Sequence, residues 1–193
     1  MANEIVRFNS FDEVRQIAET FALTGYFDAK GTNPVEVAKA ATKIMAGAEM
    51  GFRPFASING INIIQGRPSV SGNLIATAIK RSGKYDYRVR EKTDTICKVE
   101  FFERIAGKME SIGTEVFTAE DARKAGTKNM ATYPKNMLFN RAISNGYRTF
   151  CPDVFEAGSV YTPEELGAAV DGDGEIIEST ARTVDTQTGE IVE

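Results

Sequence analysis

Three strand-like segments joined by short connectors constrain the fold of this chain more than any other feature of its sequence. Residues 85–91, 95–103 and 109–117 are rich in the β-branched and aromatic side chains typical of strands. The connectors hold Lys92-Thr93-Asp94 and Ala106-Gly107-Lys108. Parallel neighbours need a crossover of about a dozen residues or more, whereas antiparallel neighbours need only a tight turn. The segments therefore predict an antiparallel β-meander.

Helix-forming patterns lie on both sides of the predicted meander. Five segments begin with a capping side chain or a first-turn proline, and apolar residues recur behind them at helical spacing. We expect these helices to begin at Ser10, Asn33, Ser71, Thr118 and Pro134 and to end near Gly25, Gly51, Gly83, Gly126 and Gly146. Residues 52–71 predict a compact loop with one short strand or hairpin at 61–65. The predicted fold class is α+β, with N-terminal helices, a central three-stranded antiparallel β-meander and C-terminal helices.

Charge divides the chain into two unlike regions. Up to Val160, 22 Lys and Arg oppose 18 Asp and Glu, whereas from Tyr161 onward 1 opposes 9. From about Ala168 the sequence has no aromatic residue and little apolar patterning, which is typical of disorder. We therefore expect one domain over residues 1–167, followed by a disordered acidic tail over 168–193.

The residue types present exclude several kinds of catalysis. The chain has no histidine, which removes Ser-His-Asp catalysis and histidine-bound metals. Cys97 and Cys151 stand alone in the sequence, so two buried reduced thiols are expected rather than a disulfide or a zinc site. Neither a phosphate-binding loop nor a dinucleotide fingerprint is present. We expect a protein that is not an enzyme.

The acidic residues and the apolar runs add no metal site and no membrane anchor. The run DGDGE at 171–175 looks like the start of a calcium loop, but the twelfth position is Arg182, where a glutamate is needed. No spaced set of carboxylates predicts a magnesium-dependent nuclease. No apolar run approaches the ~18 residues of a spanning helix, and the chain does not open with a signal-type segment. We expect a cytoplasmic protein.

The clearest positive signal is a basic segment interleaved with aromatic residues. Between residues 122 and 152 there are six basic residues and no acidic one. Lysine and arginine contact phosphates and aromatic rings stack on bases, so this combination is typical of sequence-tolerant single-strand binding. A basic helix is also commonly just a solvated face, and the residues alone leave both interpretations open. The aromatic residues of the segment are Tyr133, Phe139, Tyr147 and Phe150.

Three runs stand in order around the predicted strands: GFRPFASINGINIIQGRPSVSGNLIATAIKRSG, YPKNMLFNRAISNGYRTFCPDVF and YTPEELG. Together they resemble the RecT-like branch of the RecT/Redβ phage single-strand annealing proteins, over roughly residues 4–167. The resemblance implies ATP-independent annealing of complementary DNA strands during phage recombination and DNA repair, in the cytoplasm of the bacterial host. It also implies a homo-oligomeric ring or helical filament on the strand. No cofactor is required, and Mg2+ is a candidate modulator of DNA binding or annealing.

The resemblance also indicates which residues contact DNA. Arg141 is the strongest single candidate, and Arg141→Ala is expected to weaken strand binding while sparing the fold. The residues placed at the DNA groove are Lys128, Tyr133, Lys135, Asn140, Arg141 and Arg148, with Lys80 and Arg81 as a second group. The matching loop at Asn59, Gly60, Gly66, Arg67 and Pro68 is expected to be structural or to contact a neighbouring subunit, with Arg67 as a candidate phosphate contact.

The acidic C-terminus departs from the family pattern, because family members often carry a further partner-binding region there. This puts in doubt docking to a phage exonuclease or to a host single-strand-binding protein. The tail either competes for the basic groove or aids solubility. Two alternatives to annealing stay open: a non-annealing module that protects single strands, and a structural or host-interaction protein of a phage.

Overall fold

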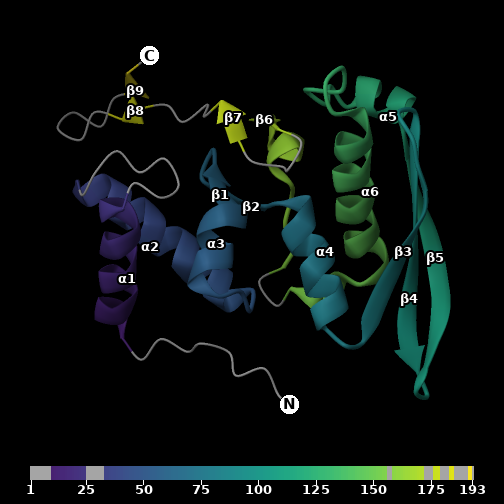
Figure 1. Cartoon of the computed structure of the whole chain (residues 1–193), viewed down its shortest axis with the longest axis horizontal. Helices are drawn as coiled ribbons and strands as arrows, with labels where there is room; N and C mark the ends of the chain where they lie inside the picture. Colours follow the sequence, from purple (N-terminus) through teal and green to yellow (C-terminus); the bar gives the residue numbers. More distant parts are fainter. Residues whose placement is uncertain are drawn as a thin grey trace.

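The computed structural model of the chain is α+β, as the sequence predicts: helices cover one face of a three-stranded sheet (Figure 1). The structure describes residues 10–24, 33–155, 158–171, 176–178, 183–184 and 191–192. Its helices are α1 (Phe11–Leu23), α2 (Pro34–Glu49), α3 (Pro54–Gly60), α4 (Gly72–Arg81), α5 (Ala119–Lys124) and α6 (Pro134–Phe150), with the 3-10 helices η2 (Pro152–Val154) and η3 (Pro163–Leu166). Its strands are β1 (Ile61–Ile64), β2 (Arg67–Val70), β3 (Tyr85–Lys92), β4 (Ile96–Ile105), β5 (Lys108–Thr118), β6 (Ala169–Val170), β7 (Ile176–Glu178), β8 (Thr183–Val184) and β9 (Ile191–Val192).

The main sheet is the predicted antiparallel meander, in the order β3-β4-β5. The central strand buries Cys97, Val99 and Phe101 on one face, in the alternation expected of a half-buried strand. Each outer strand carries an irregularity in its pairing: β3 between Val89 and Glu91, and β5 opposite Phe101 and Phe102 of β4. Cys97 and Cys151 are free and buried, as predicted, and burial raises their pKa values to about 11 and about 12.

Helix α6 packs on β4 and β5, and α4 lies beside it against β3 (Figure 1). The expectation that Gly146 ends this helix is wrong, because α6 continues to Phe150. Gly146 instead lies where the helix meets the sheet: a Cβ atom at this position would overlap the ring of Phe101 and lie 3.2 Å from Cβ of Glu115. Glycine is therefore placed here for close approach and not for helix termination.

We expect Gly146→Ala to destabilise the protein by about 1–3 kcal/mol, because the added methyl group overpacks the contact with Phe101. Helix propensity alone gives the opposite sign, since alanine favours a helix by about 1 kcal/mol over glycine. Urea unfolding of both proteins measures the difference, with Thr149→Ala on the exposed side of α6 as the control. A gain in stability for Gly146→Ala would show that the helix does not approach the sheet this closely.

The segment 52–71 is more ordered than its turn-rich sequence suggests. It contains the expected hairpin, β1-β2, with Gln65 and Gly66 at positive φ in the turn. It also contains a helix that was not predicted, α3, which begins at Pro54. Ser57 donates a hydrogen bond to the carbonyl of Arg53 within this helix. A segment rich in loop-forming residues thus contains a short helix, and this helix packs against α2.

The N-terminal helices form a second, smaller core on the side of the molecule away from the sheet (Figure 1). The predicted caps are confirmed: Ser10 accepts a hydrogen bond from the backbone N–H of Glu13, and Asn33 accepts one from that of Glu36. The buried residues shared by α1, α2 and α3 are Val14, Ala18, Ala41, Ile44 and Ile58.

The packed body extends past the boundary expected after Gly167. Ala168 and Val170 are buried, and Asn129 donates a side-chain hydrogen bond of 2.5 Å to the carbonyl of Val170. Short strand β6 then pairs with β7. Most of the predicted disordered tail, including residues 172–175 of the calcium-like run, lies outside the described residues.

Candidate nucleic-acid interface

The eight residues predicted to contact DNA do not form one surface. Four of them make contacts within the protein: Arg81, Asn140, Arg141 and Arg148. The other four are exposed around one edge of the sheet and the start of α6: Lys80, Lys128, Tyr133 and Lys135.

Glu165 of η3 pairs with two of the predicted groove residues. Its carboxylate is 3.2 Å from Nη1 of Arg141 and 2.7 Å from Nη2 of Arg148, and its side chain is only 5% exposed. Ser144 also donates a hydrogen bond to it. Burial alone would raise the pKa of Glu165, but the hydrogen bonds from Arg148 and Ser144 outweigh burial and hold the pKa below its usual value. This cluster fastens the chain after Val160 to α6.

Arg141 and Arg148 are both engaged by Glu165, and their contact with DNA stays a prediction. Arg148 also donates to the carbonyl of Val160, 3.1 Å away, and to Oδ1 of Asn145. Removing one partner of a buried ion pair leaves the other charge uncompensated. Arg141→Ala is therefore not the fold-sparing substitution that the sequence suggests.

Arg81 and Asn140 are likewise engaged in packing. Arg81 donates hydrogen bonds to the carbonyls of Met50 and Gly51, and thereby satisfies backbone groups at the end of α2. Asn140 is buried on α6, and its side chain occupies the space that a Cβ atom on Gly72 of α4 would need. Asn140 is buried, whereas Arg81 is exposed despite these hydrogen bonds.

Glu164, next to Glu165, is a buried carboxyl group with a different environment. It is 6% exposed, and neither of its oxygens makes a hydrogen bond of normal geometry within the described part of the chain. Burial raises the pKa of Glu164, and the side chains of Asn140 and Thr162 offset this only in part. A carboxyl whose pKa is higher in the folded state binds protons more tightly there, so its contribution to stability falls as pH rises.

We expect Glu164→Gln to stabilise the protein at pH 7, because the amide carries no charge to be desolvated. The gain should shrink as the pH falls toward the unfolded pKa of about 4.3, where the wild-type carboxyl is protonated in both states. Urea unfolding at a series of pH values checks this, with Glu110→Gln at an exposed position as the control. A constant difference between variant and wild type would contradict the burial of a titrating group.

Two neighbouring rings flanked by cations lie along β3, an edge strand of the sheet that faces α4 (Figure 1). Nζ of Lys80 is 4.7 Å from the ring centre of Tyr87, and the rings of Tyr87 and Phe139 are 6.3 Å apart. Nζ of Lys92 is 4.9 Å from the ring centre of Phe139. Lys135 precedes Phe139 by one turn on the same side of α6. We call this set the β3-edge stripe: Lys80, Tyr87, Phe139, Lys92 and Lys135.

Of the lysines of the β3-edge stripe, Lys135 is paired with an exposed acid, whereas the acid that pairs with Lys80 is only 25% exposed. Lys80 pairs with Asp86, and Lys135 lies 4.0 Å from Asp94 at the limit of an ion pair. Lys92 has no ion pair among the described residues. Solvent-exposed pairs contribute about 0–1 kcal/mol, so a phosphate group can replace Asp94 beside Lys135 at little cost. The two rings are half-buried at the rim of the main core.

Tyr87 and Lys92 were missed because they lie in a strand far from the basic segment in sequence. Their contacts with Phe139 of α6 form only in the folded chain, so no local pattern in the sequence marks them. Two predicted residues lie near the stripe's α6 end: Tyr133, 36% exposed at the start of the helix, and exposed Lys128.

Within the described residues, no group of acidic or cysteine side chains is arranged to hold a metal ion. None of the helices described is both long and apolar enough to cross a bilayer. Comparison with known protein families, curated proteins and solved structures gives no match. The assignment of function therefore rests on the residues and their geometry.

Proposed function

We propose that this protein binds single-stranded DNA along the β3-edge stripe and promotes the pairing of complementary strands without ATP. The observation that carries the proposal is the chain of contacts in which Lys80 and Lys92 flank the neighbouring rings of Tyr87 and Phe139. Cations that neutralise phosphates beside rings that stack on bases are the recurring features of sequence-tolerant strand binding.

The annealing part of the proposal is supported by the sequence resemblance to RecT-like annealing proteins. In that scheme, copies assemble on the strand as a ring or filament, and many weak contacts add up to stable binding. The complementary strand supplies the specificity by base pairing, so the protein needs no side chains that read base edges. A role in phage recombination in a bacterial host, an exonuclease partner and modulation by Mg2+ belong to the same proposal.

The phosphate contacts can be tested one lysine at a time. We expect Lys92→Ala to weaken binding to a short oligo(dT) and to lower the slope of log K against log salt by about 0.7, the value for one phosphate contact on a single strand. Fluorescence anisotropy over a salt series measures both. Lys108→Ala, at the opposite end of the sheet, is the matched control. If both variants changed the affinity and the salt slope equally, the β3-edge stripe would not be the surface that binds the strand.

Annealing itself is measured with two complementary oligonucleotides, one labelled with a donor dye and one with an acceptor. We expect the purified protein to accelerate their pairing without ATP, and Lys92→Ala to reduce the acceleration because strand binding is weaker. Binding without acceleration would favour a module that only protects single strands. No binding at low salt would contradict both and favour a structural or host-interaction protein.

A further inference from the structure

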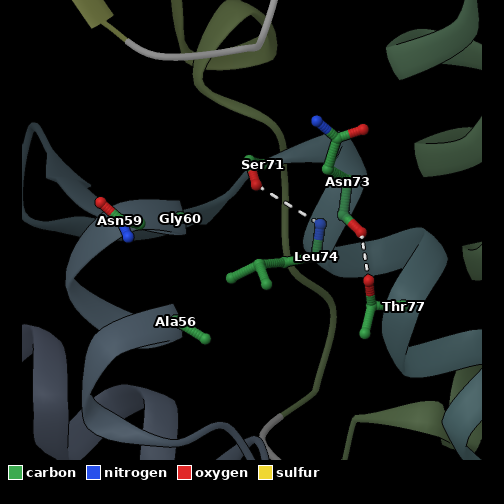
Figure 2. Close-up of a pocket in the computed structure, with 7 residues that line it drawn as sticks. All are labelled: Ala56, Asn59, Gly60, Ser71, Asn73, Leu74 and Thr77. Carbon is green, nitrogen blue, oxygen red and sulfur yellow. Dashed lines mark hydrogen bonds between the residues drawn. The ribbon is translucent and has the colours of Figure 1, made fainter.

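A pocket of about 230 Å³ lies between α3 and α4, outside the β3-edge stripe (Figure 2). Leu74 points from α4 toward α3, where Ala56 and Asn59 face it (Figure 2). The α4 side is completed by Ser71, Asn73 and Thr77. The local structure is fixed by two hydrogen bonds: Ser71 caps α4 by accepting from the N–H of Leu74, and Thr77 donates to the carbonyl of Asn73, 2.8 Å away.

The lining of this pocket fits an uncharged, flat and partly polar ligand. No ionisable side chain lines it, so it provides no counter-charge for a phosphate group. Ala56 and Leu74 supply apolar walls, while amide and hydroxyl groups surround them. Amides and hydroxyls both donate and accept hydrogen bonds, so they can meet the varied edges of different bases. The volume is below the ~300 Å³ at which pockets for drug-sized ligands begin, which suits a single heterocyclic base.

The pocket continues directly into the β3-edge stripe along one face of α4. Asn73, Thr77 and Lys80 are spaced by four and three residues, so they share the exposed side of that helix. Seven residues of helix rise by about 10 Å from Asn73 to Lys80. A strand bound at Lys80 therefore passes the mouth of the pocket within a few nucleotides.

We propose that the pocket between α3 and α4 takes one unstacked nucleobase from a single strand whose phosphates lie on the β3-edge stripe. This inference rests on the proposed function and adds a base-binding site to it. Within the described residues, the side chain of Asn59 has no hydrogen-bond partner, which leaves its amide available to a base edge. A paired base cannot enter the pocket, so the site favours single strands over duplex and releases its base when the complementary strand pairs.

The test compares oligo(dT) with an abasic oligomer of the same length and the same number of phosphates. Ala56→Phe fills the pocket, and Ala38→Phe places the same substitution at an exposed position on α2. We expect Ala56→Phe to weaken binding of oligo(dT) about tenfold, within the range for loss of one base contact, and to leave abasic binding unchanged. Lys80→Ala should weaken the binding of both oligomers by the same factor, because it removes a phosphate contact.

Asn59→Ala provides a second variant that adds no bulk, and thermal unfolding confirms that each variant is folded. It should also weaken binding of oligo(dT) and not of the abasic oligomer. If Ala56→Phe and Asn59→Ala bind oligo(dT) as the wild type does, or weaken both oligomers equally, the pocket holds no base, while the proposed function stands. If the wild type binds neither oligomer at low salt, the proposed function fails and this inference fails with it.

Discussion

The contact between Gly146 and Phe101 determines how closely α6 approaches the sheet, and the rest of the structure follows from it. With no side chain at Gly146, the helix rests directly on the ring of a central-strand residue. The same helix then carries Phe139 to Tyr87 of the edge strand and turns Arg141 and Arg148 toward Glu165. A helix held further away would separate the rings of the β3-edge stripe and weaken the ion pairs of the C-terminal segment.

The basic residues of α6 differ in their burial and in their acidic partners. At its start, Lys135 is exposed and lies 4.0 Å from Asp94, at the limit of an ion pair. About two and about four turns later, Arg141 and Arg148 share a buried carboxylate that no solvent ion replaces at low cost. Burial thus separates basic residues that look alike in the sequence. Lys135 is exposed to solvent, whereas Arg141 and Arg148 are held in internal ion pairs.

Local signals in the sequence account for most of the secondary structure. Side-chain caps at Ser10, Asn33 and Ser71 and the short connectors of the meander act over a few residues, so they can be read without knowing the fold. The end of α6 could not be predicted, because the role of Gly146 depends on a ring 45 positions away in the chain. The site was only partly predicted for the same reason: whether an arginine is free depends on Glu165, and the stripe combines a helix with a distant strand.

The irregular pairing in both outer strands has a consequence for how copies of this chain can associate. Among the described residues, β3 and β5 each pair only with β4, so both edges of the sheet have unpaired backbone groups. Irregularities of this kind bend and twist a strand, which makes it a poor template for a further strand. We therefore expect that the sheets of two neighbouring copies do not pair edge to edge.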